Sequence, residues 1–525
     1  MAVEVIRDLI KVEQVIGEEL AQTMVEGDFV VSDEKPDLNR ILAVDGRVTI
    51  SGKEALQDRV VVEGSIKFTL LYISDEKESP LCSIEVDQSF TQNVELPGVK
   101  PKMNVRIKGT VEHIDYGIIN SRKFKANAVL NLDVKVTNVI QLEVVKKIEG
   151  VEDIQVLSDN IKVTDVIGEG TSQTMVKEDI ELPDDKPLID NILYSQAQAV
   201  VRDKRTMENR VVVEGEVNLK TLYVADDDDK SINYVQHSIP FSQFVQVDGA
   251  LENMDCEVEA SVDEVYSSVR ENAMGEATIL AAEAVVGLWV RVCFTEDIQA
   301  VMDAYSPTRN LEIGTKDLKI VQMVGQGDAD VVIKESIDIP SEVPEVSKVY
   351  SIDARPMITD HKIGDDRVIV EGILGINMLY MAANSEQLVH NYAWEVPFRH
   401  FIPFDGIAQD MEADLTIDTT ALEYNVIAPD EVEVKTTLRA SAVVTRQVEK
   451  KVILTVKEAE GEQQPQELSS ITIYYVKEGD ILWDIAKRFN TTVEDILKTN
   501  EIEDQEKLDK GKPILIYRRK QYKLA

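Results

Sequence analysis

The stretch that decides the fold is Arg59-Val60-Val61-Val62-Glu63-Gly64, and the chain contains it three times. It returns 151 residues later as Arg210–Gly215, and a further 157 residues on as Arg367–Gly372, with isoleucine for one valine. Other landmarks keep the same two offsets, which chance does not do over this length. They are Gly17, Gly168 and Gly325; Pro36, Pro187 and Pro344; Tyr72, Tyr223 and Tyr380; Gly98, Gly249 and Gly406. The sequence therefore predicts three copies of one domain, followed by a tail that matches none of them.

Each copy has the pattern of β-strands. Apolar residues alternate with polar or smaller ones after the shared motif, and the parity is the same in all three copies, which predicts one buried face. The alternating residues are Ile66, Phe68, Leu70 and Tyr72; Val217, Leu219, Thr221 and Tyr223; Leu374, Ile376, Met378 and Tyr380. Polar stretches then follow as expected hairpin connections, at Ser74–Ser79, Asp226–Lys230 and Asn384–Gln387. We expect a mainly β protein, with each copy an all-β sandwich or open barrel of about eight or nine strands.

The repeats set the expected domain limits. They predict β-rich domains at 1–150, 151–308 and 309–456, a polar flexible linker at 457–470, and a small mixed domain at 471–520. The segments near 139–157 and 293–315 are predicted to connect the repeats, with at most a short helix or strand. The Glu-Gly step of the shared motif indicates a bulge or a close backbone approach rather than a ligand site.

Composition and charge limit the classes of function. The first 470 residues contain 45 Lys and Arg against 86 Asp and Glu, and such an acidic surface argues against nucleic-acid binding. No stretch has the apolar length of a membrane-spanning helix. The opening residues Met1–Asp8 carry acids where a signal peptide has its apolar core, so we expect a cytosolic product. Three cysteines are too few for a disulfide framework.

A search for catalytic chemistry finds no motif. The chain has no Walker A loop, HExxH, GxSxG or paired CxxC sequence. Its histidines do not recur at equivalent positions of the repeats, and the run Asp226–Asp229 lacks the glycine and glutamate of a calcium loop. We therefore expect no enzymatic activity, no catalytic residues, no metal site and no cofactor.

The tail changes from strand to helix periodicity. Ile473 and Tyr475 alternate as a strand, and Gly479-Asp480 turns the chain, with Asp480 as the expected N-cap of a first helix. Two helical stripes follow, with Thr492 and Asp495 as a capping box before the second, and a last strand closes a β-α-α-β order. The stripes are Leu482, Ile485, Ala486 and Phe489, then Val493, Ile496 and Leu497; the last strand is Ile514–Ile516.

This tail resembles a LysM domain. The segment Tyr475–Phe489 matches the opening motif of that family nearly position by position, and Asn500, Leu508 and Gly511 stand where the family pattern expects them. The family usually has threonine at the position of Ile481, so a groove hydroxyl is missing here, which favours protein docking over sugar. Trp483 is expected in the core. The resemblance implies a glycan or protein groove lined by Gly479, Asp480, Ile481, Leu482, Asn500, Glu501 and Ile502.

Three acidic β-repeats with a terminal LysM domain resemble the SipL-type clostridial spore coat morphogenesis proteins. That resemblance implies a non-enzymatic scaffold at the forespore surface, in the cytoplasm of the mother cell. It would work with the ATPase that forms the basement layer of the coat. LysM modules also bind N-acetylglucosamine polymers such as peptidoglycan, which is a possible second partner. Two alternatives stay open: a phage-tail or injection-machine component whose LysM domain touches cell wall, and a cell-wall-binding accessory to a hydrolase.

Overall fold

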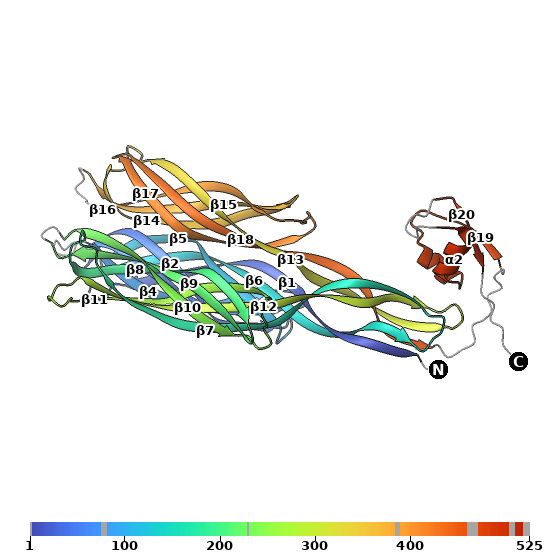
Figure 1. The fold of residues 1–525 in the computed structure, drawn as a ribbon. Helices are drawn as coiled ribbons and strands as arrows, with labels where there is room; N and C mark the ends of the chain where they lie inside the picture. Colours follow the sequence, from blue (N-terminus) through green and yellow to red (C-terminus); the bar gives the residue numbers. More distant parts are fainter. Residues whose placement is uncertain are drawn as a thin grey trace.

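The computed structural model describes residues 3–74, 81–227, 230–383, 389–458, 471–502 and 510–517. Each repeat contributes six antiparallel strands to these residues, and the three sets match element by element (Figure 1). The first repeat holds β1 (Glu4–Val30), β2 (Leu38–Leu56), β3 (Arg59–Ser74), β4 (Leu81–Glu95), β5 (Asn104–Asn120) and β6 (Lys123–Glu149). The second holds β7 (Gln155–Glu181), β8 (Ile189–Met207), β9 (Arg210–Ala225), β10 (Ile232–Gln246), β11 (Asp255–Arg270) and β12 (Ile279–Tyr305). The third holds β13 (Leu311–Asp338), β14 (Val346–Gly364), β15 (Arg367–Ala382), β16 (Val389–Pro403), β17 (Glu412–Ala428) and β18 (Glu431–Glu458).

Each repeat is a sandwich of two three-stranded sheets. In the first repeat the sheets have the orders β1-β6-β5 and β2-β3-β4, and the other repeats copy them. The inner faces of both sheets meet in one core per repeat. Ile66 and Phe68 are fully buried in the first core, which confirms the predicted parity of β3. The strands are fewer and longer than the eight or nine expected, because they run through bulges without breaking. The predicted hairpin loops fall largely outside the described residues.

The shared motif opens the central strand of one sheet. Gly64 faces Ile50, next to a bulge that the neighbouring strand makes between Ile50 and Gly52. A Cβ atom on Gly64 would lie 2.6 Å from the Thr49 carbonyl oxygen and 2.7 Å from the Phe90 ring. The same bulge and the same close approaches recur at the equivalent glycines of the other repeats, Gly215 and Gly372. The prediction of a bulge with close backbone approach is confirmed.

The other landmarks are paired by hydrogen bonds. The buried Tyr72 donates its hydroxyl proton to the Pro36 carbonyl at 2.9 Å, and the later repeats repeat this bond between their own tyrosine and proline. Gly98 has φ +93°, and its N–H donates to the Asp58 carboxylate at 2.8 Å. Each bond joins residues about 36 to 40 positions apart.

The long strands of the three repeats leave their sandwiches and pack together as a stalk. A bulge at Gly17, and at the equivalent Gly168 and Gly325, marks the exit from each sandwich. Beyond it the pairs β1–β6, β7–β12 and β13–β18 continue as two-stranded ribbons (Figure 1). Their apolar faces meet in one cluster. The stalk core contains Ile10, Val12, Val144, Ile161, Val163, Ile298, Ala300, Leu318, Ile320 and Val452. The segments near 139–157 and 293–315 therefore belong mostly to long paired strands, and the prediction that they are mainly connections is wrong.

The sandwiches also meet each other around one pseudo-threefold axis. Neighbouring repeats touch in a closed ring, through β4 with β8, β10 with β14, and β16 with β2. A second shared apolar cluster lies at the end away from the stalk tip and takes equivalent residues from each repeat. It contains Leu42, Leu193 and Tyr350; Leu71, Leu222 and Leu379; Leu81, Val224, Ile232 and Val389. A third shared cluster continues the stalk core and contains Val145, Ile148, Val301, Ala304, Ile453 and Val456. Among the described residues, the repeats thus form one interlocked body, in which each repeat has its own core and three further cores are shared.

The C-terminal domain has the predicted β-α-α-β order. It consists of β19 (Ile471–Tyr475), α1 (Leu482–Arg488), α2 (Val493–Asn500) and β20 (Pro513–Tyr517). Thr492 caps α2 by accepting from the Asp495 N–H, as predicted. Asp480 does not cap α1: the N-cap is Ile481, without a side-chain bond, because the Asp480 carboxylate is held in the preceding turn.

Candidate functional site

The first predicted groove loop precedes α1. Its turn is held by Asp480, whose carboxylate accepts the Lys477 N–H and the Tyr474 hydroxyl, both at 2.8 Å. These bonds, the backbone one first, lower the pKa of Asp480 below its ordinary value. Gly479 has φ +84°, which only glycine adopts without strain. Ile481 is 51% exposed, whereas Leu482 is buried in the core.

The second predicted loop follows α2. The Asn500 side chain donates to the carbonyls of Ile496 and Leu515, each at 2.8 Å, and accepts the Leu515 N–H at 2.6 Å. Asn500 therefore ties α2 to β20 and has little capacity left for a ligand. Glu501 ends the helix at φ +52°, exposed, and Ile502 packs partly against the core. Of the seven predicted groove residues, Gly479, Ile481 and Glu501 offer the accessible surface.

An exposed apolar face lies on the two-stranded sheet of this domain. Three cross-strand pairs put Ile471 beside Tyr517, Ile473 beside Leu515, and Tyr475 beside Pro513. Ile473 and Tyr475 are 60% and 63% exposed. We call this set of six residues the sheet face. The sequence showed the alternation in β19, but it did not show which side of the strand the helices would leave uncovered.

Trp483 was predicted to lie in the core, and it does pack against the core of the LysM domain, at the margin of the cluster. It is half-buried, and its indole N–H donates to the Asp303 carboxylate of the second repeat at 2.8 Å. Its ring meets that of Tyr305 edge to face, with 5.0 Å between the ring centroids. Sequence reasoning missed this contact, because nothing in the spacing of the tail points to a residue of the second repeat.

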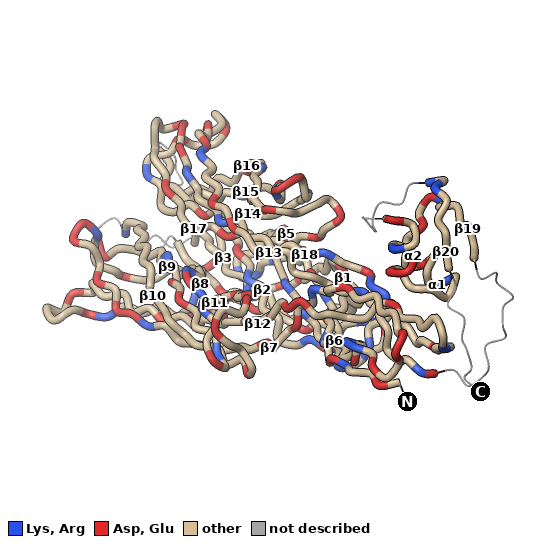
Figure 2. Tube along the Cα trace, turned by 45° about the vertical axis from the view of Figure 1, so that its right-hand side comes forward, with Lys and Arg blue, Asp and Glu red and all other residues tan. Residues whose placement is uncertain are grey.

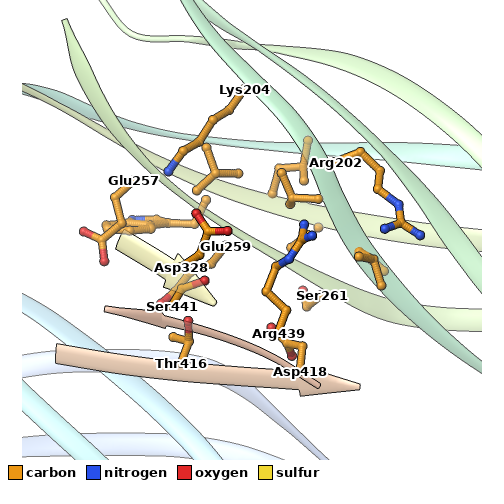
Figure 3. A pocket seen from close by; sticks show the side chains of 18 of the residues that line it. Arg202, Lys204, Glu257, Glu259, Ser261, Asp328, Thr416, Asp418, Arg439 and Ser441 are labelled. Carbon is orange, nitrogen blue, oxygen red and sulfur yellow. The ribbon is translucent and has the colours of Figure 1, made fainter. Parts of the chain in front are cut away.

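Charged clefts separate the repeats near the pseudo-threefold axis. A cleft of about 1060 Å³ lies between the second and third repeats, and Figure 3 shows its side chains. Those labelled in the figure include Arg202, Lys204, Glu257, Glu259, Asp328, Asp418 and Arg439. Glu257 occupies the position that Arg106 has in the first repeat and Asp414 in the third. Equivalent positions thus carry different charges, which suits pairing between repeats rather than one site repeated three times.

Charge over the rest of the repeats is mainly negative. Figure 2 shows Asp and Glu on strands of all three repeats, with Lys and Arg interspersed. Within the described ranges, no group of His, Cys, Asp and Glu has the arrangement of a metal site. Neither helix of the described part of the chain combines the length and the apolar character needed to span a bilayer.

The comparison with known families fits this architecture. Residues 37–119, 188–270 and 345–427 match the SipL SPOCS domain, and residues 474–516 match the LysM domain. The three SPOCS matches cover β2–β5 and their counterparts, while the long strands that build the stalk lie outside them. No curated protein and no solved structure gives a significant match.

Three acidic β-sandwich repeats followed by a small LysM domain define a sporulation-related adaptor with a cell-wall-binding domain. The chain is a SipL-type protein, with three SPOCS domains in tandem followed by one LysM domain.

Proposed function

We propose that this protein is a non-enzymatic scaffold in spore coat assembly, whose LysM domain docks to the ATPase of the coat basement layer. The repeats form one elongated body, and the LysM domain lies beside its stalk end (Figure 1). Such an arrangement separates a large body, which would keep the protein in place, from a small domain, which would bind the partner. The setting would be the cytoplasm of the mother cell, at the surface of the forespore.

The observation that carries the proposal is the sheet face. Ile471, Ile473 and Tyr475 are each more than half exposed on a domain of about 45 residues. An apolar and aromatic surface of this kind is typical of protein interfaces. In the groove, two of the polar side chains that could hydrogen-bond a sugar polymer, Asp480 and Asn500, already have internal partners. Protein docking is therefore the function that this domain supports best.

Peptidoglycan is the second candidate partner of the LysM domain. The exposed surface at Gly479, Ile481 and Glu501 belongs to loops at the ends of the helices, not to the sheet face. Protein and glycan would therefore use different residues, and substitutions can separate them.

The absence of enzymatic activity is part of the proposal. Its support is the variation of charge at equivalent cleft positions, since Arg106, Glu257 and Asp414 cannot perform one shared reaction step. Turnover of ATP, peptide or glycan substrates by the purified chain alone, lost on substitution of a cleft residue, would contradict it.

The proposal is tested by binding of the full chain to the purified basement-layer ATPase and, separately, to peptidoglycan sacculi. The double substitution Ile473→Asp, Tyr475→Asp places two charges on the sheet face, and we expect ATPase binding to weaken by about tenfold or more. Ile481→Asp changes the groove loop and should reduce only sedimentation with sacculi. Lys498→Ala is the control, because its side chain is 72% exposed on α2 and belongs neither to the sheet face nor to the predicted groove residues.

The two partners give distinguishable outcomes. If the sheet-face variant binds the ATPase as well as the wild type does, protein docking through this face is wrong. If it fails on sacculi while Ile481→Asp does not, the assignment of surfaces is reversed. Localisation is a separate readout: a fluorescent fusion should surround the forespore during sporulation, and an even distribution in the mother cell would count against the scaffold.

A further inference from the structure

The LysM domain is bound to the tip of the second ribbon of the stalk. Asp303, near the end of β12, accepts the indole N–H of Trp483 at 2.8 Å. The ammonium group of Lys487 lies 2.6 Å from each oxygen of the same carboxylate. One carboxylate thus receives a charged and a neutral donor from the same face of α1, which are the stronger kinds of contact that an acid makes.

Tyr305 adds an apolar part to this contact. Its ring is 6% exposed, packs edge to face on Trp483, and belongs to the same buried cluster as Ile485 and Ile496 of the LysM domain. Its hydroxyl donates to the Thr491 carbonyl at 2.9 Å. Burial raises the pKa of Tyr305 above its ordinary value, so the hydroxyl remains a donor even at a pH where an exposed tyrosine ionises.

The other two ribbons lack these residues at equivalent positions. The strand pairing aligns Asp303 with Lys147 in the first repeat and with Thr455 in the third. Tyr305 corresponds in the same way to Glu149 and Lys457. A lysine or threonine offers no carboxylate to Lys487, so neither of the two equivalent positions can make this contact.

The LysM domain contacts a different ribbon from the one that precedes it in sequence. The strand that precedes the LysM domain is β18, which ends at Glu458 in the third repeat. A contact with the third ribbon would keep the domain beside the strand that precedes it in sequence. The LysM domain lies instead on the ribbon that carries Asp303 and Tyr305.

We propose that Asp303 and Tyr305 form a latch that holds the LysM domain on the stalk with the α1 face covered. The latch leaves Ile473, Tyr475 and Ile481 exposed. It thereby fixes where the sheet face and the groove loops lie relative to the repeats. The Asp303 and Lys487 side chains are 26% and 41% exposed, so salt can compete for the pair and the latch is reversible. A partner that binds the α1 face must open it.

The test uses the purified full chain and no partner, so its result does not depend on the proposed function. Asp303→Lys introduces the residue of the first repeat. The charge-swapped pair Asp303→Lys, Lys487→Asp restores opposite charges, and Thr455→Lys makes the matched change on the third ribbon. Solution X-ray scattering reports the radius of gyration, and amide hydrogen exchange reports protection at the end of β12 and in α1.

We expect Asp303→Lys to increase the radius of gyration and to speed exchange in both segments by at least about fivefold. Exchange in β19, α2 and β20 should stay as in the wild type, which shows that the LysM domain remains folded. The swapped pair should recover at least part of the protection, Thr455→Lys should change nothing, and high salt should move the wild type toward the Asp303→Lys result. The latch is overturned if Asp303→Lys matches the wild type in both measurements, or if Thr455→Lys opens the chain equally.

Discussion

Arg106 and Glu257 occupy the same position in two successive repeats, and they bind each other across the pseudo-threefold axis at 2.8 Å. The Arg106 guanidinium also contacts Glu259 and lies 3.6 Å from Asp414, the equivalent residue of the third repeat. Burial lowers the pKa of Arg106, but the carboxylates outweigh burial and hold it above its ordinary value. Divergence between the copies has therefore produced complementarity at the axis.

The first prediction concerns this arginine. Arg106→Ala leaves Glu257, Glu259 and Asp414 close together without their cation, because the Arg106 side chain is only 25% exposed. We expect the free energy of unfolding to fall by about 2–3 kcal/mol in denaturant titrations. Arg205→Ala is the control: that side chain is 62% exposed beside Glu214, and its loss should cost less than about 1 kcal/mol. Equal effects would mean that the axial contact does not hold the repeats together.

A second prediction concerns the glycine of the shared motif. Gly215→Ala places a methyl group 2.5 Å from the Val200 carbonyl oxygen and 2.6 Å from the Phe241 ring, so the sandwich must shift. We expect a loss of about 2 kcal/mol or more, measured by thermal or chemical unfolding. Gly117→Ala has nothing within 4 Å of its new carbon and should change stability by about 0.5 kcal/mol or less. A mild Gly215→Ala variant would remove the packing reason for the motif.

A third prediction concerns alkaline pH. Burial raises the pKa of Tyr223 and Tyr380 to about 12, above the ordinary value of 10. The unfolded chain loses these protons first, so stability should be unaffected below pH 10 and should fall as the pH rises from 10 to 12. Tyr223→Phe loses the bond to the Pro187 carbonyl, about 1–2 kcal/mol at pH 7, and should show a shallower alkaline decline. An unchanged slope in a series of melting curves between pH 9 and 12 would contradict this.

A fourth prediction concerns a carboxylate at the base of the stalk. Burial raises the pKa of Asp165 although Lys11 is 3.7 Å away, and one carboxylate oxygen has no hydrogen-bond partner among the described residues. Because the folded-state pKa is raised, stability is lost as the pH rises through it. The ionised carboxylate therefore destabilises the folded protein at pH 7. Asp165→Asn should therefore raise the melting temperature at pH 7, and the gain should shrink toward pH 4.

The control for that experiment has the opposite sign. Hydrogen bonds, first from Lys362, lower the pKa of the exposed Asp360, so its ionised form favours the folded state above its ordinary pKa. Asp360→Asn should give no gain at pH 7. A gain of similar size in both variants would attribute the effect to net charge rather than to the burial of Asp165.

Local structure could be predicted from residues alone. The parity of Ile66, Phe68 and Leu70 fixes the buried face of β3, because alternate side chains of a strand point to opposite sides. The Glu-Gly step of the shared motif indicated a bulge, and the motif at Tyr475–Phe489 indicated the LysM fold. The polar groups of its groove were harder to assess. The bonds of Asp480 are local, to Tyr474 and Lys477, whereas Asn500 bonds to Leu515 on the last strand, which the motif does not include.

The sequence by itself determined three things: that the domain is triplicated, that each copy is built of strands, and that a mixed module follows. These three conclusions follow from the spacing of residue types within single segments and from the repetition of those segments. Only the tertiary structure decided that the copies close around an axis, that Arg106 meets Glu257, and that Asp303 receives Trp483. Those contacts join residues about 150 to 180 positions apart, and a linear pattern shows which positions are equivalent but not which of them touch.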